Sequence, residues 1–78
     1  MKINTVNVIE YYNGTIKDVH AFTDDPEGNK QADKLFVAIA IDQERFSDED
    51  IEGGLDDGWL SHGDWELYIV NSNTEWAA

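Results

Sequence analysis

Two apolar segments meet at the dipeptide Asn13-Gly14, and this turn constrains the fold more than any other feature of the chain. Residues 3–12 are rich in Ile, Val and Tyr, and residues 15–22 contain Ile16, Val19, Ala21 and Phe22. Asn-Gly between two such segments is the strongest local signal for a β-hairpin, because a type I′ turn needs positive φ at both central residues. We therefore expect two antiparallel strands joined at this turn.

The alternation within each strand predicts which side chains share a face of the sheet. Val6 and Val8 are expected on one face of the first strand, with Ile9 and Tyr11 on the other. In the second strand, Ile16, His20 and Phe22 are expected to share a face.

Two helices are expected after the hairpin. Asp25 can cap the first, and Pro26 suits its first turn, so that helix is predicted over residues 26–41. Ser47 is expected to cap the second helix and Gly58 to end it. The pair Gly53-Gly54 weakens this second helix, because glycine costs about 1 kcal/mol relative to alanine inside a helix.

A third strand is predicted over residues 65–70, and residues 59–63 are expected to form a loop or a short extension. The element order is therefore β-β-α-α-β in a single small α+β domain, residues 1–78. The ordered core is expected over about residues 3–72, with a loose tail at 73–78. The simplest packing is a three-stranded, mostly antiparallel sheet with two helices packed on one face.

The opposite face of such a sheet has no intramolecular cover. Tyr11, Tyr68 and Val70 are among the side chains expected there, and an exposed apolar patch of this kind is typical of a dimer or partner surface. The alternative is that loops and the tail shield it.

The charge of the chain excludes several classes of partner. Seventeen acidic residues face five basic ones, for a net charge of −12, and a surface of that sign repels nucleic acid and anionic membranes. No signal peptide follows Lys2, and the longest nearly apolar segment, residues 35–41, is shorter than the roughly 20 residues of a membrane span. We therefore expect a cytoplasmic protein with a basic partner.

The acidic residues are concentrated in one part of the sequence. Residues 1–41 carry six acids and four lysines, whereas residues 42–66 carry ten acids and a single base, Arg45. Asp56 and Asp57 stand at the end of the second helix, where the helix dipole disfavours negative charge. This distribution favours a surface that presents charge, although acidic surfaces also serve solubility alone.

Two segments resemble functional motifs. Asp48-Glu49-Asp50-Ile51-Glu52-Gly53 matches the opening of an EF-hand loop, but Trp59 stands at position 12, where a bidentate Glu is required. Ser61-His62-Gly63-Asp64 contains the residue types of a catalytic triad, yet adjacent residues do not converge as a triad requires. The sequence therefore predicts no catalytic residue, no metal site and no cofactor, and hence a protein that is not an enzyme.

In its small size, its acidic residues 42–66, its lack of cysteine and its element order, the chain resembles the small acidic anti-defence proteins of phages and mobile elements. These include anti-restriction and anti-CRISPR proteins, several of which imitate DNA. The resemblance implies a basic, nucleic-acid-binding host protein as the partner, and a host-cell cytoplasmic location. The alternative is a phage or bacterial structural or accessory module that forms a homodimer through the open face of its sheet.

The surface expected to meet this partner combines carboxylates with two aromatic anchors, because aromatic residues commonly dominate interface energies. Its candidate residues are Asp48, Glu49, Asp50, Glu52, Asp56, Asp57, Trp59, Asp64 and Trp65.

Overall fold

The N-terminal hairpin forms as expected. In the computed structural model, which describes residues 2–75, β1 (Lys2–Tyr12) pairs antiparallel with β2 (Thr15–Thr23). Asn13 and Gly14 adopt φ values of 53° and 76°, the double positive φ of a type I′ turn. The predicted hairpin is therefore confirmed.

The sheet has four strands rather than the expected three. β3 (Trp59–His62) and β4 (Trp65–Glu75) form a second antiparallel hairpin, and the strand order is β2-β1-β4-β3. The two-residue turn Gly63-Asp64 joins them, with Gly63 at a φ of 59°. Residues 59–62 thus form an edge strand, and the expectation of a loop or a short extension there was wrong. β4 also extends to residue 75, so residues 73–75 of the segment expected to be loose pair with β1. Residues 76–78 lie outside the described part of the chain.

Both helices begin and end close to the predicted residues. α1 (Pro26–Asp42) is capped by the Asp25 carboxylate, which accepts a hydrogen bond of 2.6 Å from the backbone N–H of Gly28. α2 (Asp48–Asp57) begins at a reciprocal capping box, in which Ser47 and Asp50 each accept from the backbone N–H of the other. Gly58 ends α2 at a φ of 90°. Neither described helix is long and apolar enough to span a membrane.

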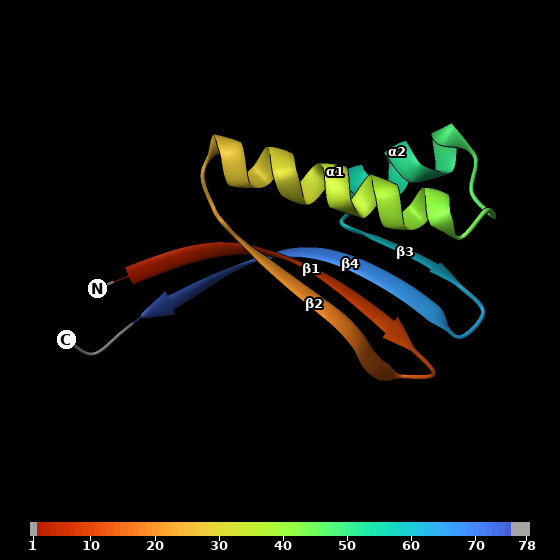
Figure 1. Ribbon diagram of the computed structural model, residues 1–78, viewed down its shortest axis with the longest axis horizontal. Coiled ribbons are helices and arrows are strands. Elements are labelled where there is room, and N and C mark those ends of the chain that lie inside the picture. The colour runs from red at the N-terminus through yellow and green to blue at the C-terminus, as the bar shows by residue number, and fades with distance from the viewer. Residues whose placement is uncertain (1, 76–78) are drawn as a thin grey trace.

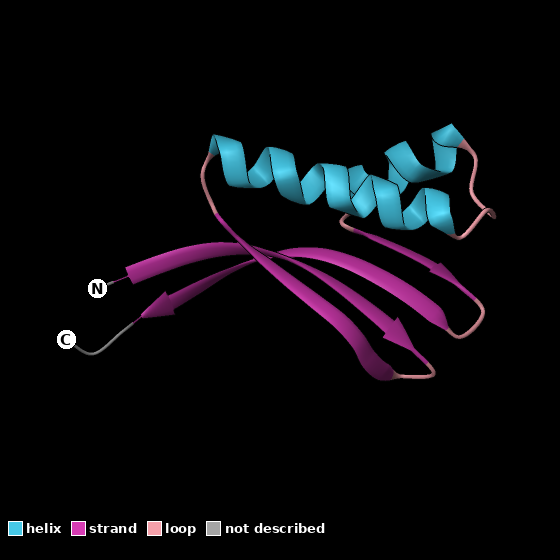
Figure 2. Cartoon of the chain, in the orientation of Figure 1, coloured by secondary structure: helices cyan, strands magenta, loops and turns pink. Residues whose placement is uncertain are grey.

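The molecule has two layers, with both helices on one face of the sheet (Figure 1 and Figure 2). The helices connect β2 at one edge to β3 at the other, so together they cover the sheet across its width. The core lies between the layers and is formed by Val6, Val8, Ala32, Phe36, Ala40, Ile51, Leu60, Trp65 and Leu67. The expected packing of two helices on one sheet face is therefore confirmed.

A β-bulge changes the face of one predicted side chain. The β1–β2 register shifts between Glu10 and Tyr11, so that Ile16 pairs with Tyr11 while Phe22 pairs with Val6. Directly paired residues share a face, and Ile16 therefore lies on the face away from the helices. The prediction that Ile16 shares a face with His20 and Phe22 was wrong, because one extra residue in a strand reverses the alternation.

Candidate binding surface

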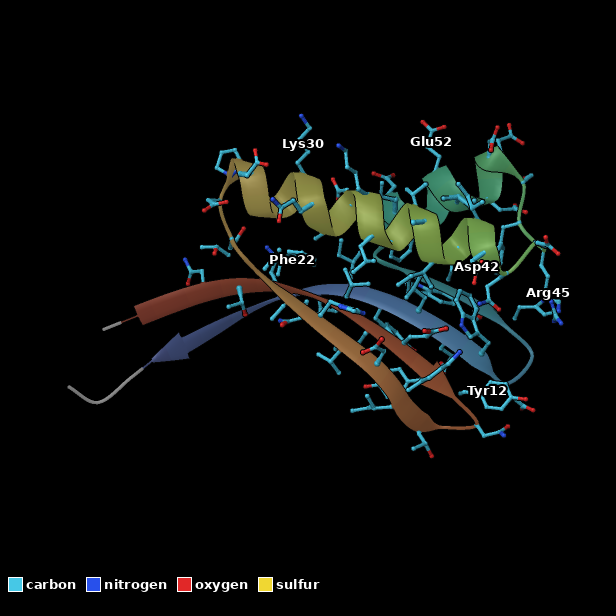
Figure 3. All side chains as sticks on the ribbon, viewed as in Figure 1. Tyr12, Phe22, Lys30, Asp42, Arg45 and Glu52 are labelled. Atoms are coloured by element: carbon cyan, nitrogen blue, oxygen red, sulfur yellow. The ribbon has the colours of Figure 1, made fainter. Side chains whose placement is uncertain are left out.

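The outer side of α2 is covered by carboxylates. At about 100° per residue, the six acids of the helix spread over an arc of about 200°, and Ile51, Gly54 and Leu55 occupy the remainder. Ile51 and Gly54 are buried against the core, and Leu55 is half-buried. All six acidic side chains, Asp48, Glu49, Asp50, Glu52, Asp56 and Asp57, are exposed. Figure 3 shows Glu52 pointing away from the sheet.

These carboxylates have no basic partner within the described chain. The two ion pairs between residues 2 and 75 are Lys17 with Glu10 and His20 with Asp18, and neither involves α2. Arg45 precedes the helix and points outward from the loop in Figure 3. The dipole of α2 stabilises the three acids of its first turn but opposes Asp56 and Asp57 at its end. The charge is therefore left available for an external cation.

Shallow hollows lie on both sides of α2. One of about 600 Å³ runs between the two helices and is lined by Asp33, Glu49, Glu52 and Asp56 together with Gly53 and Leu55. A second of about 530 Å³ lies between α2 and β3, where Arg45, Phe46 and His62 contribute to its wall. Both are open to solvent and lined by a mixture of polar and apolar groups. They suit side chains from a partner surface better than an enclosed small molecule.

The two tryptophans that were expected to act as anchors lie on different sides of the sheet. Trp59 is 49% exposed and pairs with Tyr68, so it lies on the face away from the helices. Trp65 is 6% exposed and belongs to the core, where its indole Nε1 donates a hydrogen bond of 2.7 Å to Glu10. Asp64 is exposed in the β3–β4 turn. Trp59 still contributes to the lining of the hollow between α2 and β3, together with Glu49, Asp50 and Asp57. The structure therefore brings the α2 acids together and places Trp59 at their border, but it removes Trp65 from the surface.

The sequence motifs with possible chemistry have structural explanations. The six residues that resemble an EF-hand opening form the first part of α2, which places their carboxylates around a helix rather than inside a loop. His62 packs edge-on against the Phe46 ring at a centroid distance of 6.4 Å. No group of three or more residues of metal-binding type converges among residues 2–75.

A buried carboxylate is the polar feature that the sequence did not reveal. Glu10 is 8% exposed on the helix-facing side of β1 and accepts the Trp65 hydrogen bond, with Lys17 Nζ 3.7 Å from the same Oε2 atom. The alternation that places Glu10 beside Val6 and Val8 was the available signal. Glu10 fixes the orientation of Trp65 and so contributes to the core rather than to a surface.

The open face of the sheet carries a second hydrogen-bonded pair, Tyr68 and Glu66. The Tyr68 hydroxyl donates a hydrogen bond of 2.8 Å to Glu66 Oε1, and its ring packs edge-on against Tyr11. The hydrogen bond to Glu66 raises the pKa of Tyr68 above its ordinary value, because ionisation removes the proton that Tyr68 donates and places a tyrosinate beside a carboxylate.

A pH titration should show Tyr68 ionising at a higher pH than an ordinary tyrosine. Since the folded pKa of Tyr68 is raised, its stabilising effect is present below the unfolded pKa and is lost as pH rises through the folded pKa. Tyrosinate absorbance of the folded protein should therefore include a late phase that belongs to Tyr68, and Glu66→Gln should move this late phase to lower pH. A late phase unchanged by Glu66→Gln would contradict this assignment.

Comparison of the chain with protein-family models, with curated proteins and with solved structures finds no match.

Proposed function

We propose that this chain is a non-enzymatic binding protein whose α2 surface occupies a basic, nucleic-acid-binding surface of a host defence protein, in the manner of a DNA-mimicking anti-restriction or anti-CRISPR protein. The observation that carries the proposal is the set of six exposed α2 carboxylates, none of which is paired with a base within the described residues. Such a protein acts in the cytoplasm of the host cell.

The density of charge on α2 supports the imitation of DNA. Ten helical residues span about 15 Å at about 1.5 Å per residue, which gives one carboxylate per about 2.5 Å of helix axis. Duplex DNA carries one phosphate per about 1.7 Å. A groove lined by Lys and Arg that has evolved to bind DNA phosphates therefore meets a comparable density of negative charge on this helix.

The rigid attachment of α2 also supports the proposal. The helix is capped at both ends and anchored by buried Ile51, and buried Gly54 lets it lie close to Leu60 of β3. A charged surface held on a fixed backbone loses less conformational entropy on binding than a flexible acidic segment. Electrostatic attraction to a basic partner should make association fast at low salt and weaker at high salt.

The test compares two variants of equal charge. Glu49→Gln/Glu52→Gln/Asp56→Asn removes three charges from α2 and leaves its capping box intact. The control, Asp18→Asn/Glu27→Gln/Asp42→Asn, removes three charges elsewhere, so that each variant raises the net charge of −12 by three. Each immobilised protein is used to capture DNA-binding proteins from a host lysate, and duplex DNA serves as the competitor.

We expect a captured protein that duplex DNA displaces, and at least a tenfold loss of its affinity, about 1.4 kcal/mol, for the α2 variant. The control variant should lose far less affinity for the captured protein. Binding of the captured protein to the wild type should weaken as salt rises from about 0.05 M to about 0.5 M. Equal losses for both variants would show that only net charge matters. Binding that neither salt nor duplex DNA weakens would refute the proposed mechanism.

A further inference from the structure

We infer that the face of the sheet away from the helices is a self-association surface, on which a second copy of this chain docks face to face. This inference does not depend on the function proposed for α2, because other residues on the opposite side of the molecule carry it. Neither helix of the described residues covers this face, as Figure 2 shows.

An apolar row crosses all four strands of this face. The strand register pairs Trp59 with Tyr68, Tyr68 with Ile9, and Ile9 with Val19, so these four side chains lie side by side from one edge of the sheet to the other. Trp59 and Val19 are each 49% exposed. The neighbouring rows add Tyr11, Ile16 and Val70, of which Ile16 is 54% and Val70 40% exposed.

Charge is almost absent from this face. Among the side chains that the structure describes, Glu66 is the one charged group on it, and its carboxylate already accepts the Tyr68 hydrogen bond. Asp18 pairs with Glu10 and so lies on the helix side, and Lys17 reaches Glu10 there. The bulge that turns Ile16 outward therefore adds an apolar side chain to the open face.

The distribution of charge identifies a second copy as the occupant. A copy with net charge −12 is repelled by the α2 side, whereas two open faces meet with one carboxylate each. Sheets packed face to face lie about 10 Å apart. The acidic helices are then separated by both sheets and the interface, well beyond the Debye length of about 8 Å at physiological salt. A two-fold arrangement of this kind is closed and self-complementary.

The size of the face predicts a reversible dimer. Strands of 11, 9, 4 and 11 residues, at about 3.3 Å per residue and about 4.8 Å between strands, cover a footprint of about 550 Å². Stable interfaces bury about 800 Å² on each partner. The dimer should therefore form in a concentration-dependent manner.

The edge of the sheet is less suited to self-association than its face. At the middle of edge strand β2 the Val19 N–H is bonded to the side chain of Asp18, with N and Oδ1 3.0 Å apart. A charged pair at Lys17 and Asp18, together with the bulge in the β1–β2 ladder, further protects this edge from pairing with another strand.

The test places the same charge on two exposed apolar residues. Val19→Glu puts a carboxylate in the apolar row, and Ile41→Glu puts one on α1, where Ile41 is 57% exposed. Sedimentation equilibrium over a concentration series, at about 0.15 M and about 0.5 M salt, measures the dimer dissociation constant. We expect Val19→Glu to raise this constant at least about tenfold, because the interface buries an unpaired charge, and Ile41→Glu to leave it within about threefold.

Salt distinguishes this interaction from binding through α2. Screening does not weaken an apolar contact between two acidic copies, so the dimer should hold or strengthen as salt rises, whereas an α2 complex should weaken. Glu66→Gln keeps an oxygen that can accept the Tyr68 hydrogen bond and removes the one charge on the described part of the face, so it should tighten the dimer severalfold. This variant tests the surface independently of Val19→Glu, which could fail to fold.

Three results would overturn the inference. A wild-type protein that stays monomeric up to about 0.5 mM at both salt concentrations has no such surface. Equal weakening by Val19→Glu and Ile41→Glu would reflect net charge alone. A dimer that neither Val19→Glu nor Glu66→Gln alters forms through another surface, such as the β2 edge.

Discussion

Replacing Trp65 with phenylalanine should lower the free energy of unfolding by about 2 to 3 kcal/mol. The substitution removes the indole N–H that donates 2.7 Å to Glu10, and leaves a carboxylate that is 8% exposed without its buried donor. A buried polar group that loses its partner costs about 1 to 3 kcal/mol, and the smaller ring adds a cavity. Small domains commonly have about 0.05 to 0.15 kcal/mol of stability per residue, so this loss is a large fraction of the total.

A double-mutant cycle separates the hydrogen bond from the loss of volume. Glu10→Leu alone leaves the Trp65 N–H unpaired. In that background, Trp65→Phe no longer leaves a buried carboxylate without its hydrogen-bond donor. The cost of Trp65→Phe should therefore fall by about 1 kcal/mol or more when Glu10 is leucine. Urea unfolding followed by far-UV circular dichroism measures all four proteins. A cost of Trp65→Phe that is the same in both backgrounds would show that the hydrogen bond contributes nothing.

The face of Trp65 could be predicted from the sequence, but its hydrogen-bond partner could not. A tryptophan beside ten acids indicates an interface anchor as readily as a core residue. The choice depends on which face of β4 points at the helices, and that was predictable from Leu67 and Ile69. Its partner, Glu10, lies 55 positions away in the sequence. A contact of that range is set by the β1–β4 register, which no local pattern specifies.

Features with a local physical cause were predicted correctly. The Asn13-Gly14 turn, the Asp25 cap, the Ser47 cap and the Gly58 helix end each depend on a few neighbouring residues. The exposure of the α2 acids was also predictable, because ionised carboxylates are rarely buried without partners.

The missed strand had a signal of its own. Gly63-Asp64 is a two-residue hairpin connection, with glycine at the position that needs positive φ. Only four residues, Trp59–His62, precede it, and a strand that short shows too little alternation to recognise. The bulge that reverses Ile16 is likewise invisible in sequence, because strand alternation assumes an unbroken ladder.

The two proposed surfaces divide the molecule by chemistry. The α2 side presents carboxylates that form no ion pair within the described residues, and the opposite sheet face presents apolar side chains with Glu66 as its single charge among those residues. If both proposals hold, a dimer joined at the sheets displays two acidic helices on opposite sides. One dimer then engages two basic sites, and the gain in avidity depends on whether a partner presents both within reach.

Alanine at Gly54 and alanine at Gly53 should have opposite effects on stability. A Cβ on Gly54 would overlap the Leu60 side chain, which is buried under α2, and overpacking of this kind costs about 1 to 3 kcal/mol. A Cβ on Gly53 meets nothing within 4 Å, and alanine there should gain about 1 kcal/mol of helix stability. Thermal unfolding should show the Gly54→Ala midpoint falling and the Gly53→Ala midpoint rising, by about 4 to 8 °C per kcal/mol.

The pair also separates two reasons for the glycines in α2. Gly54 is explained by the close approach of the helix to β3, so its presence says nothing about binding. Gly53 has no packing reason within the described structure, and at about 100° per residue it lies near the centre of the acidic arc. If a partner approaches the backbone there, Gly53→Ala should raise the unfolding midpoint and yet weaken capture of that partner. A Gly53→Ala protein that is more stable and binds equally well would leave the carboxylates alone as the determinants of binding.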